Sequence, residues 1–230
     1  MTMFPTPTAE IGAPSECGNI SADRILAHRG WWHRREERNS FAALSAAFAA
    51  GYGIETDIRD RDSELVISHD PATRDSLPFA QLLERYLELG AKGILALNIK
   101  ADGLAAPVSR LLTEYGIPAE KAFVFDMSIP DMLAYVRAGI PYYTRQSEYE
   151  PQPALFAGAA GVWLDAFQSC WYDASLIEGH LAAGRDVCVV SAELHGRPYE
   201  DQWRMIREVD GGVAGRLLIC TDFPHLYRKP

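Results

Sequence analysis

Two histidines, an arginine and a pair of carboxylates stand at the ends of short apolar segments in the first third of the chain. His28 and Arg29 directly follow one apolar run, and His69 follows another. Glu55 and Asp57 lie two residues apart in a third segment of the same kind. Histidine transfers protons near neutral pH, arginine binds phosphoryl oxygens, and paired carboxylates can hold a hard divalent cation. These residue types suit metal-assisted phosphoryl chemistry.

Polar residues also recur just after the later apolar segments. They are Asn98, Lys100, Asp126, Asp165, Glu193, His195, Thr221 and Asp222. Each of them alone is explained as well by a turn or by a solvated strand end. Glu193 and His195 lie in an unusually polar stretch, and we predict that both bind substrate, with Glu193 as an alternative metal ligand. The recurrence of such residues at successive segment ends predicts a single site.

The elements that must position these side chains alternate along the chain. Apolar segments typical of strands cover residues 24–27, 53–58, 65–68, 93–99, 122–125, 141–144, 161–164, 186–190 and 216–220. Segments with the periodicity of helices cover residues 40–50, 79–89, 104–115, 129–138, 154–160, 175–183 and 200–209. Ser40 is a predicted N-cap and Gly51 a predicted stop for the first helix.

This alternation predicts an α/β fold with a parallel sheet. If residues 65–68 extend the second strand, there are eight strand-helix units, which fit a compact (β/α)8 TIM barrel. A doubly wound open sheet is the alternative. In a barrel the carboxyl ends of the strands meet at one mouth, so the polar residues listed above would converge there. Glu55 and Asp57 would share one face of their strand, because side chains alternate along it.

The bulk composition is that of one globular domain. The chain has 230 residues and a net charge of −9, which argues against a general nucleic-acid or anionic-membrane surface. Residues 1–21 read as a flexible lead-in without the features of a signal peptide, and residues 22–230 as the domain. The four cysteines form no paired motif, and Cys188 and Cys220 lie in apolar runs as predicted buried thiols. A reduced cytoplasmic setting is the simplest interpretation.

A family resemblance is carried by residues 25–70. The pattern HRG, then NS, then E-x-D, then V-x-x-HD is similar to the N-terminal signature of the glycerophosphodiester phosphodiesterase family. That family belongs to the phosphatidylinositol-phospholipase-C-like phosphodiesterase superfamily. A looser match runs through residues 95–100 to Thr221-Asp222-Phe223-Pro224, which resembles the family's terminal T-D-x-P. The resemblance implies a TIM barrel that hydrolyses a small phosphodiester, usually with a divalent metal such as Mg²⁺ or Ca²⁺.

The resemblance also implies a role for each matching residue. His28 and His69 resemble the family's acid/base pair, and Arg29 resembles its phosphate-binding arginine. Lys100 resembles the lysine that reaches the phosphoryl group or metal-bound water. Glu55 resembles one of its metal ligands.

The rest of the implied metal shell is Asp57, which resembles a second ligand, and Asn98, which departs from the pattern. The family tends to have a glutamate where this chain has Asn98, and commonly has a glutamate where it has Arg38. An asparagine carbonyl can still bind a hard cation, but it brings no charge, so we expect weaker metal affinity.

Three functions stay open at this point. The first is metal-dependent hydrolysis of a phosphodiester. The second keeps the fold without the metal, as a lyase that releases a cyclic phosphate. The third is a catalytically silent barrel that binds a phosphorylated sugar or headgroup.

Overall fold

The computed structural model describes residues 20–209 and 215–228. Nearly all of the predicted lead-in, residues 1–19 with Cys17, lies outside the described residues. The remainder forms the domain in which every predicted site residue lies.

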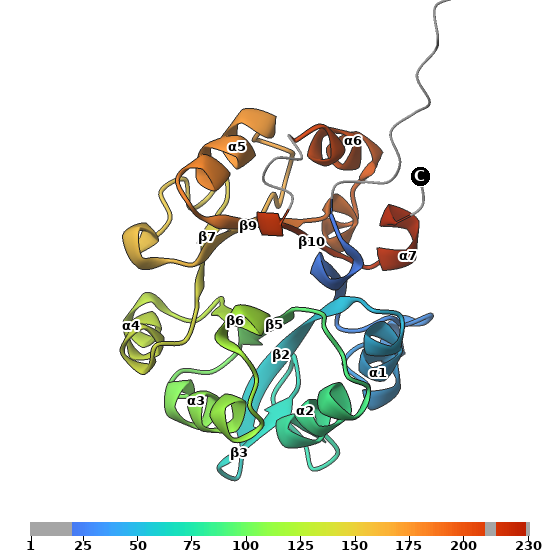
Figure 1. Ribbon diagram of the computed structural model, residues 1–230, viewed down its shortest axis with the longest axis vertical. Helices are drawn as coiled ribbons and strands as arrows, with labels where there is room; N and C mark the ends of the chain where they lie inside the picture. The colour runs from blue at the N-terminus through green and yellow to red at the C-terminus, as the bar shows by residue number, and fades with distance from the viewer. Residues whose placement is uncertain (1–19, 210–214, 229–230) are drawn as a thin grey trace, which may run out of the picture.

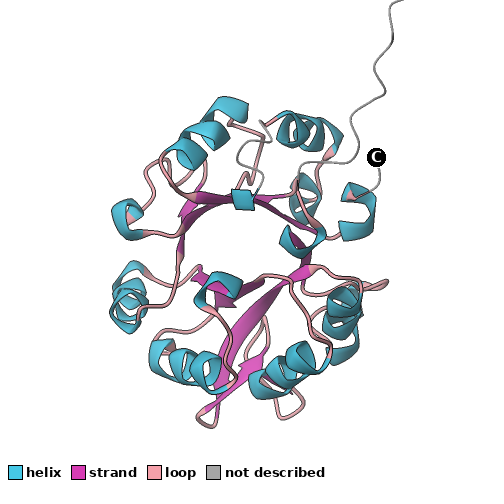
Figure 2. Ribbon diagram, in the orientation of Figure 1, coloured by secondary structure: helices cyan, strands magenta, loops and turns pink. Residues whose placement is uncertain are grey.

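Eight parallel strands form a ring at the centre of the molecule (Figures 1 and 2). They are β1 (Ile25–His28), β2 (Gly53–Arg61), β5 (Leu95–Ile99), β6 (Ala122–Phe125), β7 (Tyr143–Gln146), β8 (Gly161–Leu164), β9 (Asp186–Val190) and β10 (Leu217–Thr221). Ladders join each strand to the next from β7 through β10 and β1 to β6. A single parallel bridge between Val124 and Tyr142 spans the remaining gap, from β6 to β7. The predicted barrel is therefore confirmed.

Helices surround the ring, as Figure 2 shows in cyan. The α-helices are α1 (Phe41–Ala49), α2 (Phe79–Glu88), α3 (Ala105–Glu114), α4 (Ile129–Ala138), α5 (Ala174–Ala182), α6 (Glu200–Glu208) and the short α7 (Pro224–Tyr227). The 3-10 turns are η1 (Ala22–Arg24), η2 (Arg35–Glu37), η3 (Ala119–Lys121), η4 (Phe156–Gly158) and η5 (Ala192–His195). Ser40 caps α1 as predicted, because its hydroxyl accepts a hydrogen bond from the Ala43 amide.

The segment predicted as an extension of the second strand is a separate strand. β3 (Glu64–Ile67) runs antiparallel to the outer half of β2, and the short β4 (Leu77–Pro78) pairs with β3. Asp62 and Ser63 join β2 to β3 with positive φ angles of 52° and 70°, the backbone of a tight hairpin turn. β3 and β4 therefore lie outside the ring, and the eight other strands make the barrel.

The connection after β7 is the second departure from the prediction. Residues 154–160 were expected to form a helix, but only the single turn η4 forms there. Pro151 and Pro153 remove backbone donors just before this turn, and Leu155 adopts a left-handed conformation with φ of 52°. These features leave no continuous run long enough for an α-helix.

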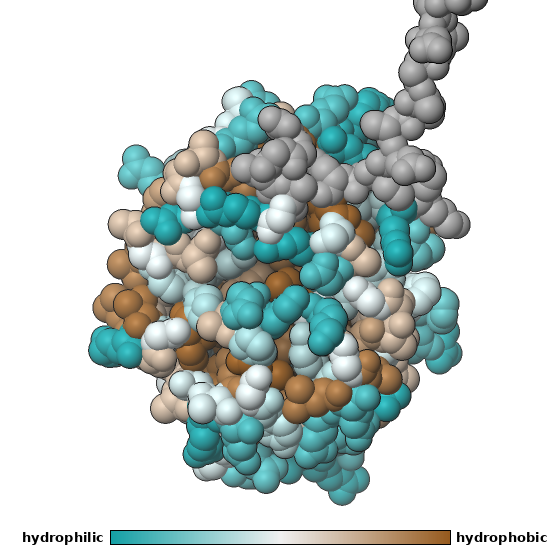
Figure 3. Space-filling view, viewed as in Figure 1, coloured by the Kyte–Doolittle hydropathy of each residue, from teal (hydrophilic) through white to brown (hydrophobic). Residues whose placement is uncertain are grey.

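Two apolar clusters follow from the alternation of side chains along the strands. The smaller cluster fills the barrel interior and includes Leu26, Ala96, Phe125 and Trp163. The larger cluster lies between the strands and the surrounding helices. Seen in the orientation of Figure 1, hydrophilic residues cover both ends of the long axis, while hydrophobic ones show nearer the middle of this face (Figure 3).

Cys188 and Cys220 are buried free thiols, as predicted, whereas the free thiol of Cys170 lies on an exposed residue. The reduced compartment that these thiols indicate stays a prediction. Among the described helices, none has the length and apolar character needed to cross a bilayer.

Gly30 offers a test of how tightly the first loop is held against α1. Its φ is +94°, and an added Cβ would lie 2.7 Å from the backbone carbon of Ala43. We expect Gly30→Ala to lower the free energy of unfolding by about 3 kcal/mol, since it adds a backbone clash to the strain of a positive φ. Gly51 is the matched control, because its φ is +80° and nothing lies within 4 Å of the added atom.

Gly51→Ala should cost about 1 kcal/mol, from backbone strain alone. Urea unfolding of both variants measures the difference. Equal losses would show that the contact with α1 is not what fixes this loop.

Candidate active site

The side chains of the site point into the barrel mouth because they continue the inward-facing pattern of their strands. Leu26 faces the barrel interior, so His28, two residues on, faces the same way. The same step leads from Trp163 on β8 to Asp165, just past its end. The register pairs His28 with Glu55 of β2. The predicted convergence of strand ends therefore holds for these residues.

His28 is held by a carboxylate from the opposite end of the chain. Its Nδ1 lies 2.7 Å from Asp222 Oδ1, and its Nε2 lies 3.8 Å from Glu55 Oε2. The Trp32 indole donates to the His28 carbonyl at 2.9 Å. Because Asp222 accepts at Nδ1, the tautomer with a proton there leaves Nε2 free to accept a proton from a bound molecule.

Glu55 is a buried carboxylate beside this histidine. Burial and, after it, the nearby charge of Asp57 raise the pKa of its carboxyl from 4.5 to about 6. The positive charges of His28 and Arg29 oppose that rise. At pH 7 Glu55 is therefore mostly ionised, although burial disfavours its charge.

Asp57 is completely buried and lies between two cations. Its Oδ2 is 3.0 Å from Arg29 Nε, and its Oδ1 is 3.2 Å from Lys100 Nζ. Asn39 donates to Oδ2 at 2.8 Å and accepts from the Thr56 hydroxyl. Both oxygens of Asp57 are thus engaged, and the carboxylate fixes Arg29 and Lys100 at the mouth.

Asn98 joins Glu55 to Asp126. Its amide nitrogen donates to Glu55 Oε1 at 3.3 Å and to Asp126 Oδ2 at 3.2 Å. Its oxygen and Glu55 Oε2 are both buried acceptors without a hydrogen-bond donor among the described residues. Two such acceptors fit a hard cation completed by water and substrate oxygens, as Mg²⁺ is often bound.

Glu55 and Asn98 thus offer buried oxygens to a cation, and the role of Asp57 as a further ligand stays a prediction. No group of three or more histidine, cysteine, aspartate or glutamate side chains is arranged for a metal within residues 20–209 and 215–228. The oxygens of Asp57 contact Arg29, Lys100 and Asn39, although Oδ1 accepts no hydrogen bond among the described residues.

Two of the cavities at the mouth contain the predicted histidines. The smaller, of about 230 Å³, contains His28 and Glu55 together with Asn98, and carries Trp163 and Phe125 on its wall. Its remaining polar lining consists of Arg29, Arg38, Asp126, Asp165 and His195. Acceptors of this kind beside aromatic rings suit a small hydroxylated group.

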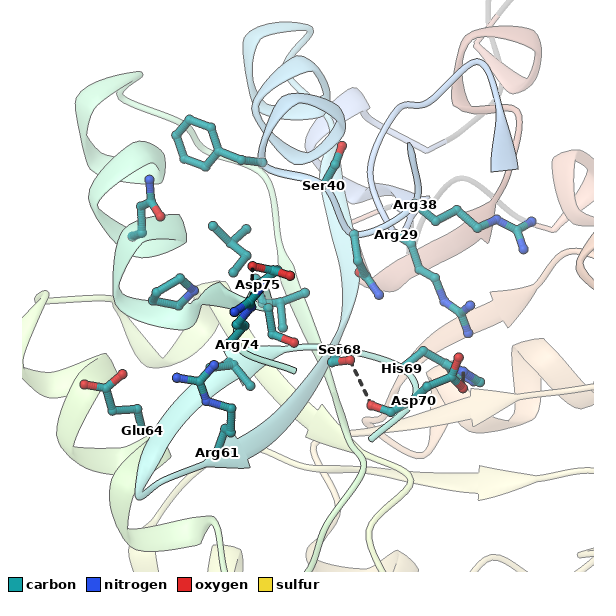
Figure 4. Close-up of a pocket in the computed structure, with 18 of the residues that line it drawn as sticks. Arg29, Arg38, Ser40, Arg61, Glu64, Ser68, His69, Asp70, Arg74 and Asp75 are labelled. Atoms are coloured by element: carbon teal, nitrogen blue, oxygen red, sulfur yellow. Dashed lines mark hydrogen bonds and ion pairs between the residues drawn. The ribbon is translucent and has the colours of Figure 1, made fainter. Parts of the chain in front are cut away.

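The larger cavity, of about 860 Å³, contains His69. Figure 4 shows Arg29 and Arg38 on one side of it, with His69 and Asp70 beside them. His69 is half exposed and its Nδ1 lies 3.0 Å from Asp70. The structure thus brings His28 and His69 to two adjoining cavities instead of one.

Glu193 and His195, both predicted to bind substrate, are placed differently. His195 lines the smaller cavity, and its Nε2 lies 2.7 Å from Asp165 Oδ1. The carboxylate of Glu193 accepts from the hydroxyls of Ser191 and Thr221 and from the Asp222 amide. Burial raises the pKa of Glu193, and its contacts serve to join β9 to β10.

Sequence reasoning gave no role to two arginines at the mouth. Arg145 faces inward on β7, and its Nε and Nη2 both donate to Asp126 Oδ1. Arg38 donates to Asp222 Oδ2 at 2.7 Å, so Asp222 contacts both Arg38 and His28. The inward alternation after Tyr143 was the signal that could have revealed Arg145.

No family model matches the chain, and no curated protein matches its sequence. Solved structures do match it. A glycerophosphodiester phosphodiesterase from Parabacteroides distasonis is similar with a TM-score of 0.65 and 19% identity, over 91% of this chain and 95% of that chain. The chain shares the fold of glycerophosphodiester phosphodiesterases.

Two further structures have the same architecture. A phosphodiesterase from Oleispira antarctica, in complex with the product sn-glycerol-3-phosphate, is similar with a TM-score of 0.63 and 16% identity, over 89% of this chain and 94% of that one. A Ca²⁺-dependent phosphatidylinositol-specific phospholipase C from Streptomyces antibioticus is similar with a TM-score of 0.54 and 12% identity, over 91% and 98%. At these identities the likeness concerns the fold.

The burial of Glu55 can be tested through stability. Because its folded pKa is raised above the ordinary value, the folded state binds the proton more tightly than the unfolded state does. The free energy of unfolding of the wild type should therefore fall as pH rises from about 4.5 to about 6. Above about pH 6 the full destabilisation from the buried, ionised Glu55 is present. Glu55→Gln removes this titration and can still accept from Asn98.

As pH rises from about 4 to about 7.5, the unfolding free energy of Glu55→Gln minus that of wild type should increase by about 2 kcal/mol. Urea unfolding of both proteins across that range measures the change. A constant difference between them would contradict the raised pKa.

Proposed function

We propose that the protein hydrolyses a small phosphodiester, as a divergent member of the glycerophosphodiester phosphodiesterase family. The observation that supports this most directly is the pairing of His28 with Asp222 at a cavity that Arg29 also lines. An oriented histidine beside an arginine provides proton transfer and phosphate binding in one place. The shared fold with known phosphodiesterases adds independent support.

Charge neutralisation is the first task of such a site. A phosphodiester resists attack because its negative charge repels nucleophiles. Arg29 and Lys100 would offset that charge, and Asp57 holds both of them in place. Cations fixed before the substrate arrives stabilise the transition state without reorganising during the reaction.

A divalent cation, Mg²⁺ or Ca²⁺, would be held by Glu55 and Asn98 through their unpartnered buried oxygens. When bound, it would supply further positive charge for the phosphoryl oxygens. Asn98 is neutral, so we propose a weaker affinity than a second carboxylate would give.

The two histidines would carry out the proton transfers. His28 would take the proton from the attacking hydroxyl, since its Nε2 faces the smaller cavity. His69, in the adjoining cavity, would protonate the leaving oxygen. Attack by a neighbouring hydroxyl of the substrate would give a cyclic phosphate, which water would then open.

The smaller cavity supports a glycerol-like group as one of the two alcohols. Asp126, Asp165 and His195 offer hydrogen-bonding groups to hydroxyls there. The Oleispira antarctica enzyme binds sn-glycerol-3-phosphate as its product, which agrees with this assignment. The larger cavity would take the second alcohol.

One observation favours a metal-independent lyase as the second candidate. Asp57 already faces two cations of the protein itself, so part of the charge that a metal would supply is present without it. A reaction that stops at the cyclic phosphate would need no more than these groups.

A hydrolysis screen tests the proposal and separates the candidates. It uses glycerophospho-alcohols, cyclic phosphates and a chromogenic diester, each with Mg²⁺, Ca²⁺, Mn²⁺ or excess EDTA. We expect turnover of a glycerophosphodiester that falls at least tenfold in EDTA. Full activity in EDTA with a cyclic product would favour the lyase, and binding without turnover in any metal would favour a silent barrel.

The acid/base pair is tested by His28→Ala and His69→Ala. Each should lower kcat about a hundredfold or more, because a proton transfer is lost from the reaction. His180→Ala is the matched control, since His180 lies on α5 and contacts Gln146 instead of either cavity. Circular dichroism should show all three variants folded. Full activity in either of the first two would refute its assignment.

A further inference from the structure

The two cavities at the mouth share a boundary. Arg29 and Arg38 are the two residues that appear in the lining of both. A molecule with one arm in each cavity would therefore lie against these side chains. The proposed substrate has that shape, because a phosphodiester carries one alcohol on each side of its phosphorus.

Two contacts hold Arg38 at this boundary. Its Nη2 donates to Asp222 Oδ2 at 2.7 Å, and its guanidinium carbon lies 4.5 Å from the centre of the Trp32 ring. Its Nε is buried and has no hydrogen-bond acceptor among the described residues. A guanidinium has five donors in a fixed plane, so the contact with Asp222 leaves donors for another anion.

We propose that Arg38 is a second phosphate-binding residue, which together with Arg29 holds the phosphodiester at the junction of the two cavities. The proposal rests on the function proposed above. One alcohol would then lie in the smaller cavity with His28, and the other in the larger cavity with His69. This placement would put the phosphorus between the cavity that His28 lines and the cavity that His69 lines.

The charge balance at the mouth explains why a second arginine is needed. Five carboxylates lie on or behind the mouth: Glu55, Asp57, Asp126, Asp165 and Asp222. Arg29 pairs with Asp57 and Arg38 with Asp222, so neither arginine alone offsets the carboxylates, and the net charge of the chain is −9. An anionic substrate would be repelled unless further fixed cations face it. Arg38 faces both cavities and provides such a cation.

Binding measurements test the proposal without relying on turnover. Calorimetric titration with sn-glycerol 3-phosphate should show a dissociation constant that rises about tenfold or more in Arg38→Gln. Arg38→Lys should recover only part of the affinity, because lysine keeps the charge but loses the planar donors. Arg204→Gln is the control, since Arg204 lies exposed on α6 and pairs with Asp201.

Asp222→Asn separates phosphate binding from the positioning of His28. It removes the negative charge beside Arg38 but leaves the arginine in place. We expect this variant to bind sn-glycerol 3-phosphate as tightly as wild type or more tightly, while kcat for a glycerophosphodiester falls at least tenfold. Arg38→Gln should instead raise KM at least tenfold with a smaller change in kcat.

The kinetic and binding results for Arg38→Gln separate the failure of this proposal from the failure of the proposed function. If Arg38→Gln lowers kcat and leaves both KM and the dissociation constant unchanged, Arg38 acts only through Asp222 and the proposal fails. If wild type turns over no diester but loses phosphate affinity in Arg38→Gln, the phosphate site stands and the hydrolase function fails.

Discussion

The ion pairs of Asp57 are the constraint on which the rest of the mouth depends. This carboxylate is completely buried, and it contacts Arg29 from the first loop, Lys100 from the end of β5, and Asn39 ahead of α1. Burying one charge costs several kcal/mol unless partners compensate. Both ends of the β1–α1 loop and the end of β5 must therefore reach Asp57 together, and the loop that carries Arg29 is fixed as a result.

The backbone of this loop shows the same constraint. Arg29 and Asn39 both have positive φ angles, of 57° and 60°, which side chains other than glycine rarely adopt. The Asn39 amide donates to the Arg29 carbonyl at 2.8 Å, and the Arg29 amide donates to the Glu55 carbonyl at 2.9 Å. Strain of about 1–3 kcal/mol at each such residue is sustained only where surrounding contacts hold it. Here those contacts also orient the cations of the site.

Most of the fold could be predicted from the sequence because local patterns of apolar residues indicate where the strands and helices lie. β6, β8, β9 and α4 occupy the predicted residues, since apolar runs with clear stops define them. The β2–β3 hairpin was missed because its turn, Asp62-Ser63, contains no glycine, although both residues adopt positive φ. The turn η4 was missed because alanine and leucine favour helix in isolation, while nearby prolines and a left-handed Leu155 prevent it.

The site was predicted in part for a related reason. Residues at strand ends could be foreseen, because parallel strands bring their carboxyl ends to one mouth. Arg38 lies in a loop, where no periodicity indicates direction, and only its contact with Asp222 places it at the mouth. Likewise, spacing could not show that Asp57 faces two cations, since Lys100 is forty-three positions away along the chain.

The separation of the two histidines limits which molecules can use both. His28 and His69 line different cavities that meet at Arg29 and Arg38. A phosphate monoester has one alcohol and can occupy one cavity while its phosphate rests at the junction. A diester has two alcohols and can occupy both. In the proposed cyclisation, a hydroxyl of the alcohol in the smaller cavity would attack the phosphorus in line with the alcohol that leaves into the larger cavity, so each histidine would act on one alcohol. Under the proposed function, both histidines would therefore have a role with the two alcohols of a diester.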